Sequence, residues 1–546
     1  MTSIISIFLF STISLVAAAD FSLGVKFNRK ECYAQILNLV NNGTLSPNDE
    51  VFFRDNIGLP MFNPNNLTLT LSGCQKLCGP KQGWYPDIGP RLETGLFPIL
   101  LLISNIELSP LDKRRFLAIV HLLGDPIDSI WSLIHKIDAW DRCYSLSEEQ
   151  DAFCGRCKRV IATVFAGFEE IEGPKITSPE YFDTLRKSSG LYQGKFREWR
   201  RTAGELADGR TDEFLRTCLA TLLYICQVIA TFDPDIGGGN TSPPGGRIGT
   251  TMFISWLVPA VLLSNVIGGF TSRRTCFDIL SRFAERTNLS IFPPGPGEST
   301  LFPECAYLER TSKTEYLKSL GWSGAIYSFR PWKTRYITCE RDRRRTALIL
   351  FLSISPICIG MAGAFIIMTV PNGFDCRHIA LIGIFLAWFV SAFITWLPYS
   401  LRFATGKYHW RFTLVKDALI AIPSIVVIFL SSCGLFNSCF CWSGFFFYGD
   451  SAHVSLSLNP FYDNTFYPAI VGICLFLQLS VFVIITTTWR HGLKLMRWSE
   501  RAKREQWENA NERGPYKRAN GSSPWSLLEK GSPKRLKKTY MCCQYY

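Results

Sequence analysis

Lys416 and Asp417 are the most chemically notable pair in this 546-residue chain, because they adjoin an uncharged run that extends from Ala418 to Gly449. Charged side chains beside a membrane segment either reach out to the lipid headgroups or form a site for a proton or a coupling ion. Both interpretations are open for this pair. The sequence therefore predicts a candidate intramembrane ion pair, with an interfacial position as the default.

Other residues that could do chemistry do not form a recognised catalytic arrangement. The six histidines are scattered, and the chain has no Walker loop, no HExxH and no GxSxG motif. Cys143, Cys154 and Cys157, with His121 and His135 nearby, are only a weak signal for zinc, because a lone CxxC pair is common. We expect reduced cysteines there, and we predict no enzymatic activity, no cofactor and no metal site.

The element that must position Lys416 and Asp417 is a membrane domain at 346–489. Hydrophobic residues make up 47% of the chain and charged residues only 19%. Four uncharged runs in this domain each exceed the about 20 residues that a helix needs to cross a bilayer. A soluble core could not cover four such helices on all sides. The runs are Thr346–Phe374, Ile379–Leu401, Ala418–Gly449 and Thr465–Trp489.

A first membrane part at 92–270 precedes this domain and is harder to interpret. It contains two weaker apolar segments and, between them, a polar loop at 112–213. If both weak segments cross the bilayer the chain has seven spans, and if neither crosses it has five. We favour an all-α polytopic bundle with seven spans, near 92–111, 214–232, 251–270, 346–370, 378–400, 412–435 and 467–489.

The distribution of positive charge predicts the orientation of this bundle. The basic loop at 271–345 and the tail at 490–546 each carry 14 lysines and arginines, which places both in the cytosol. The net charge of +13 thus follows from topology and does not indicate nucleic-acid binding. The expected partners are the lipid bilayer and anionic headgroups at its cytosolic face.

The N-terminal part has the features of a secreted segment. Residues 1–19 resemble a signal peptide, with a retained anchor as the alternative, and 20–91 would form a small extracellular or lumenal region. The N-terminus then lies outside, with the plasma membrane as the favoured location. Predicted glycosylation sites are Asn42, Asn66 and Asn240. Disulfide bonds are predicted for Cys32, Cys74 and Cys78, with a further partner among Cys376, Cys439 and Cys441.

A strip of small residues predicts a packing face on the span at 378–400. Gly383, Ala387, Ser391 and Thr395 recur every four residues, which would let a neighbouring helix approach closely. The expected partners are Pro356, Gly360 and Ala364 on the preceding span. Two polar residues within other spans, Asn265 and Gln478, are predicted to make interhelical hydrogen bonds.

Two stretches of the first membrane part resemble one another. Gly89–Asn105 and Gly245–Asn265 each have an arginine near the start, a proline inside and Ser-Asn at the end. The spacing from arginine to proline differs by five residues, so chance similarity is the alternative to a true internal repeat. If the repeat is real, the first copy is also a span.

The tail ends in a basic cluster followed by Cys542 and Cys543. Basic residues attract an anionic membrane surface, and a single acyl chain binds only reversibly, so the two together would anchor the tail. Palmitoylation of Cys542 or Cys543 is the resulting hypothesis. Two free cytosolic thiols are the alternative.

Several motifs resemble those of an uncharacterised family of multi-pass membrane proteins of filamentous fungi. They are Gly83–Arg91, Pro371–His378, Gly406–Trp410 and Phe436–Gly444, and the similarity extends over most of 70–505. The resemblance implies a membrane location and carries over no activity and no functional residue.

Three classes of function follow from these observations. Proline-broken spans favour a transport or channel-like protein. A cell-surface receptor or sensor with a glycosylated outer region is the alternative, because seven spans with the N-terminus outside suit it equally. A membrane enzyme with an unrecognised site is the third.

Overall fold

The computed structural model describes most of the chain outside its two ends and the 288–342 segment. The described residues are 25–54, 67–85, 88–95, 97–106, 115–149, 155–172, 183, 185, 196–211, 214–230, 232, 245–270, 273–287, 343–370, 373–400, 407–456 and 461–496. The predicted signal peptide, Asn66, Asn240, Cys154, Cys542 and Cys543 lie outside them.

The fold is mostly helical, as the composition predicts. In the part of the chain that the structure describes, five helical segments are long and apolar enough to cross a membrane, or six if the bent pair of helices at 117–148 counts as one span. One is a pair of consecutive helices, α12 (Gly246–Ile254) and α13 (Leu257–Ile267). The other four are α16 (Arg343–Thr369), α17 (Cys376–Ser400), α18 (Lys407–Cys433) and α21 (Tyr467–Thr488). These four correspond to the uncharged runs, because an apolar stretch of this length forms a helix that satisfies its own backbone.

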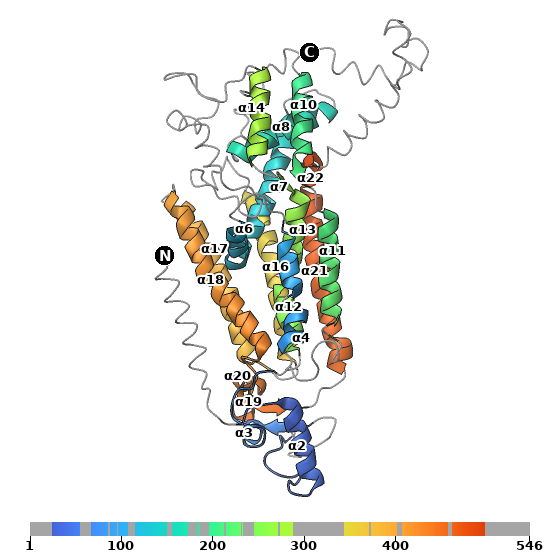
Figure 1. Cartoon of the computed structure of the whole chain (residues 1–546), viewed down its shortest axis with the longest axis vertical. Coiled ribbons are helices and arrows are strands. Elements are labelled where there is room, and N and C mark those ends of the chain that lie inside the picture. Colours follow the sequence, from blue (N-terminus) through green and yellow to red (C-terminus); the bar gives the residue numbers. More distant parts are fainter. Residues whose placement is uncertain are drawn as a thin grey trace, which may run out of the picture.

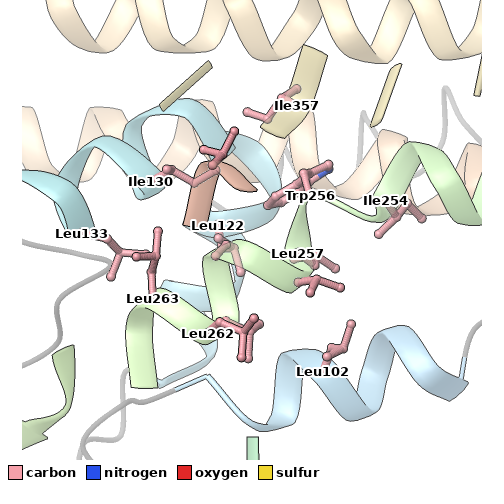
Figure 2. Packing of buried hydrophobic residues seen from close by; sticks show 14 of the residues in the cluster. Leu102, Leu122, Ile130, Leu133, Ile254, Trp256, Leu257, Leu262, Leu263 and Ile357 are labelled. Carbon is pink, nitrogen blue, oxygen red and sulfur yellow. The ribbon is translucent and has the colours of Figure 1, made fainter. Parts of the chain in front are cut away.

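The main core gathers around α12 and α13 (Figure 1). Figure 2 shows Trp256 and Leu257 among side chains of four neighbouring helices, including Leu102, Leu122 and Ile357. The neighbours are α5 (Phe97–Ser104), α6 (Arg115–Gly124), α7 (Pro126–Glu149) and α16. This central position explains why α12 and α13 are largely buried, whereas the outer helices of the bundle are not.

Outward faces of the long helices are apolar and exposed. Phe351 of α16, Trp396 of α17 and Phe476 of α21 are exposed by more than half. The helix α11 (Phe214–Ala230) is similar, with Leu215 85% exposed. Soluble proteins rarely expose so much contiguous apolar surface, so these faces are suited to lipid.

Region 112–213, which we expected to be a polar loop, is mostly helical where it is described. Its first two helices, α6 and α7, belong to the main core. A second core lies beyond them, at one end of the molecule (Figure 1). It is formed by the end of α7 with α8 (Gly155–Glu172), α10 (Phe196–Asp208) and α14 (Arg273–Thr287). A two-residue antiparallel pair, β2 (Arg210–Thr211) with β3 (Gly269–Phe270), and α22 (Arg490–Met496) lie near the same end.

A cap with its own core covers the opposite end of the bundle (Figure 1). We use "the cap" for the described residues 25–85 with 436–456. Its strands β1 (Thr68–Thr70) and β4 (His453–Ser455) pair in antiparallel register. The helices of the cap are α2 (Arg29–Asn41), α3 (Leu71–Cys78), α19 (Cys439–Trp442), α20 (Phe445–Tyr448) and the short 3-10 helix η5 (Gly449–Ser451). A short π-helix, η6 (Tyr462–Phe466), leads from the cap into α21.

Among the described residues, two disulfide bonds lie within the cap and a third joins the cap to the bundle. They are Cys32–Cys78, Cys74–Cys439 and Cys376–Cys441. The predicted involvement of the three N-terminal cysteines is confirmed, and Cys439 is the distant partner that the sequence left open. Cys376 is the first residue of α17, so the cap is covalently tied to a membrane helix.

The small-residue strip on α17 is not the packing face that its spacing predicts. Gly383 is exposed, with open space where a Cβ would stand, and Ile384 beside it is buried. On α16, a Cβ at Gly360 would come within 3.0 Å of the Met252 carbonyl oxygen. The small residues of α16 therefore pack against α12, and the predicted pairing of the two strips is wrong.

Both predicted interhelical hydrogen bonds are confirmed. Gln478 Nε2 donates to Ser255 Oγ at 2.7 Å, which joins α21 to the break between α12 and α13. Asn265 Nδ2 donates at 2.8 Å to the carbonyl oxygen of Asn105. Asn105 occupies the same place in the first repeat copy as Asn265 in the second. In the first copy, α4 (Ile88–Gly95) and α5 occupy the corresponding positions.

Candidate functional site: a buried charge network

The break between α6 and α7 places a carboxylate among the helices of the bundle. The two helices are bent by 109° around Asp125. Pro126 begins α7, a position where the missing N–H costs nothing. Asp125 caps the helix, because its Oδ1 accepts a 3.1 Å hydrogen bond from the N–H of Asp128. Its second carboxylate oxygen, Oδ2, points to neighbouring helices.

Lys416 of α18 meets this second oxygen. Lys416 Nζ donates to Asp125 Oδ2 at 2.8 Å and also lies 2.8 Å from Asp417 Oδ1. On α17, Nζ contacts Ser391 Oγ at 2.6 Å and Thr395 Oγ1 at 2.8 Å. Thr395 in turn donates to Asp125 Oδ2 at 2.7 Å. One ammonium group thus joins α7, α17 and α18.

His121 of α6 extends the network with a second base. Its Nδ1 lies 2.7 Å from Asp417 Oδ2, and its Nε2 lies 3.1 Å from Asp128 Oδ2. A neutral imidazole has only one N–H and can donate to only one of two ionised carboxylates. The second contact then requires either a doubly protonated ring or a protonated carboxyl group. The geometry around His121 therefore accommodates one more proton than a neutral ring carries.

Close backbone packing holds α6 against α17 and α18. A Cβ at Gly124 would lie 2.7 Å from the Cα of Asp417, so glycine permits this approach. Trp388 Nε1 donates at 2.9 Å to the carbonyl oxygen of Leu123, which satisfies part of the end of α6. These contacts fix His121 and Asp125 relative to Lys416.

The five charged groups of the network are buried and their charges do not balance. The exposed fraction is 7% for Lys416, 4% for Asp128 and 0% for His121, Asp125 and Asp417. Counted over these five described residues with both bases protonated, three carboxylates against two cations leave a charge of −1. Isolated charge at this depth is costly, so the network favours uptake of a proton or a cation.

The predicted ion pair of Lys416 and Asp417 is present, but the two side chains are buried and do not reach outward as the default interpretation expects. Both side chains point into the protein because α6, from the supposed loop, supplies partners for them. Ser391 and Thr395 are the buried half of the small-residue strip, and they serve as ligands to Lys416 and not as a packing surface.

Sequence reasoning missed Asp125 and Asp128 and considered His121 only as a possible zinc ligand. The sequence signal for this site is the triplet Gly124-Asp125-Pro126. Glycine permits close packing of a neighbouring helix, aspartate can cap the helix that follows, and proline is favoured at the first position of a helix. Among the described residues, no group of His, Cys, Asp and Glu has the arrangement of a metal site. Cys143 is a buried free thiol in the second core.

Asn42 is the one predicted glycosylation site within the described part of the chain. It is exposed at the end of α2, in the cap. This position leaves the amide accessible.

Comparison with known proteins gives no further assignment. No family model, no curated protein and no solved structure matches the chain. The resemblance to a fungal membrane family therefore stays a prediction.

Proposed function

We propose that this protein is a membrane transport protein in which the Lys416 network takes up and releases a coupling proton. The observation that carries the proposal is a buried cluster of five ionisable side chains, three carboxylates among them, built from the described helices α6, α7, α17 and α18. Ionisable groups inside a membrane bundle typically mark proton relays or ion pathways. Asp125, at the break between two helices, is the group best placed to respond to a movement of either helix.

The proposed topology has seven spans. Two crossings would be added to the five candidate segments. One is formed by α4 together with α5, and the other by α11. In this topology α6 and α7 do not cross the bilayer but enter it and return to the same side. A disulfide-bonded cap suits an oxidising compartment, which favours placing the cap outside and the C-terminus in the cytosol. Under this topology, a signal peptide precedes the cap, Asn42 is available for glycosylation, and the plasma membrane is the expected location.

Proton-coupled transport can be tested in sealed proteoliposomes with a pH-sensitive dye in the lumen. A panel of amino acids, carboxylates, sugars and inorganic ions is added outside, and the lumenal pH is followed. We expect at least one solute class to drive proton movement. Lys416→Met removes the cation that holds Asp125 and is expected to abolish this signal.

Lys158→Met is the matched control, because Lys158 pairs only loosely with the exposed Glu148 at 3.5 Å. It should retain wild-type proton movement. The proposal fails if no solute moves protons, or if well-folded Lys416→Met protein, judged by size-exclusion chromatography, transports like the wild type.

A receptor or sensor is the second candidate, and the Cys376–Cys441 disulfide favours it. This bond ties the cap directly to the start of α17, the helix that carries Ser391 and Thr395 at its other half. A ligand bound at the cap could thereby bias the network without transport. Such a receptor would show ligand binding and no solute-driven proton movement in the same vesicles.

A further inference from the structure

A cavity lies where the cap meets the bundle, at the end of α17 and α18 that is remote from Lys416. It encloses about 700 Å³ of empty space, its open mouth included, and is lined by residues of α4, α12, α17 and α18. Arg377 lines the cavity and Ser391 belongs to the network, and both lie on α17. Fourteen residues separate them, which is roughly 21 Å along a helix. The cavity is thus distinct from the buried charge network.

Three arginines line this cavity: Arg91, Arg247 and Arg377. None of the other described residues that line it is acidic. Arg377 donates to Asp375 Oδ2, with Nη2 at 2.5 Å, which fixes the guanidinium group. Arg91 is buried and stacks on Tyr85, with its Cζ 3.7 Å from the ring centroid. The guanidinium groups of Arg91 and Arg377 are therefore held in place before any ligand arrives.

The two copies of the repeat converge on the cavity. Arg91 and Arg247 occupy equivalent positions at the start of each copy, and both reach the same space. Gly246 adds to this arrangement, because a Cβ there would collide with Nη1 of Arg377. Glycine at the first turn of α12 leaves room for the third arginine beside a helix N-terminus, where anions are favoured.

The remaining walls are mixed. Ser431 and Thr250 supply hydroxyl groups, and Tyr85, Phe436 and Ile428 supply apolar surface. Arginine forks match carboxylate and phosphate groups geometrically.

We propose that this cavity is a binding site for an anionic group, a carboxylate or a phosphate, attached to an apolar body. The anion contacts Arg91, Arg247 and Arg377, and the apolar body lies against Tyr85 and Phe436. Such a ligand can come from water or from the membrane as a lipid with an anionic headgroup. The site stands independently of proton-coupled transport, because it needs only binding.

Thermal unfolding of the purified full-length protein tests the site in the wild type. One arm titrates benzoate and phenyl phosphate in detergent against sodium chloride at equal ionic strength. The other compares nanodiscs of phosphatidylcholine with nanodiscs that also contain phosphatidic acid. A saturable rise of the unfolding midpoint with benzoate or phenyl phosphate identifies a soluble ligand. A rise only with phosphatidic acid identifies a lipid, and no rise in either arm overturns the proposal.

Two variants then locate the binding. Arg247→Gln removes one guanidinium fork and is expected to weaken the apparent affinity roughly tenfold or more. Ser431→Phe fills the cavity from α18 and should have a comparable effect. Arg282→Gln, at an exposed position on α14, is the matched control and should bind like the wild type. Wild-type affinity in either folded cavity variant, or an equal loss in Arg282→Gln, would rule out binding at this place. These outcomes do not depend on whether the vesicles show proton movement.

Discussion

Two of the groups of buried charges along α7 differ in balance. Near its start, Asp125 and Asp128 belong to the Lys416 network, with three carboxylates and two bases. Later in the helix, Asp138 and Asp141 pair with Arg142 and Arg345. There the two carboxylates meet two guanidinium groups, so the charge sums to zero.

The two groups also differ in solvent exposure, because the balanced group is partly exposed and the Lys416 network is buried. Arg142 and Arg345 are 21% and 33% exposed in their side chains, and Asp138 also accepts a 3.1 Å hydrogen bond from Trp489 Nε1. This second group ties α7 to α16 and to the start of α22, which is a structural role. A balanced, partly solvated cluster has no need of an extra proton, whereas the unbalanced and fully buried network does. Balance, and not burial alone, separates the candidate functional site from the structural one.

The largest effect is expected for Lys416→Met. Removing this cation leaves Asp125 and Asp417 buried without their ammonium partner, which should cost about 3–5 kcal/mol of unfolding free energy. Denaturant unfolding in detergent measures it. The Lys416→Met, Asp125→Asn double variant should recover much of the stability while remaining inactive. Equal instability of the single and double variants would contradict the assigned pairing.

A smaller effect is expected for Arg345→Met in the balanced cluster. Its guanidinium group is a third exposed, so losing its bonds to Asp138 and Asp141 should cost about 2 kcal/mol. Arg345→Lys should cost less, because it keeps the charge. Neither variant should alter the pH dependence of transport, and a shift of that profile in well-folded protein would show that this cluster also handles protons.

A third expected effect is on stability in acid, at the junction between cap and bundle. Burial alone would raise the pKa of Asp375, but Arg377 and hydrogen bonds with His378 outweigh it and hold this pKa below its usual 3.8. A carboxyl group with a lowered pKa stabilises the fold above 3.8, and this contribution is lost as the pH falls toward the folded-state value. Thermal midpoints measured against pH should therefore fall in acid less steeply for Asp375→Asn than for the wild type. Parallel curves would contradict this role.

The smallest effects distinguish the two halves of the strip on α17. Ser391→Ala removes a hydroxyl group from Lys416 and should cost about 1 kcal/mol. Gly383→Ala meets open space and should be neutral or slightly stabilising, because alanine favours helix. Unfolding midpoints of the two variants provide the comparison. A loss of stability in Gly383→Ala would restore the packing face that the spacing predicts.

Much of the bundle was predictable because hydrophobic length is a local property of the sequence. The four runs of the membrane domain appear as α16, α17, α18 and α21. Asn265, Gln478 and the Lys416–Asp417 pair were also found, since a polar residue in an apolar run must find a partner.

The partners of that pair were not predictable by the same reasoning. α6 and α7 contain enough charge for the region to be classed as polar, and the partners of Asp125 and His121 in the network come from a helix about 290 residues away in sequence. The prediction of a packing face on α17 was wrong for a related reason. A four-residue spacing does not determine which neighbouring element a helix face contacts. In this structure Ser391 and Thr395 contact Lys416.

Infrared titration of the purified protein tests the central claim, that the network holds an exchangeable proton, most directly. Spectra are recorded from about pH 5 to about pH 8, where a shared proton on such a cluster can exchange. Our account predicts a protonated carboxyl band that titrates in the wild type and is lost or shifted in Asp128→Asn and Asp125→Asn, but is unchanged in Arg345→Lys. A wild-type spectrum without such a band, or one that the aspartate variants leave unaltered, would contradict it.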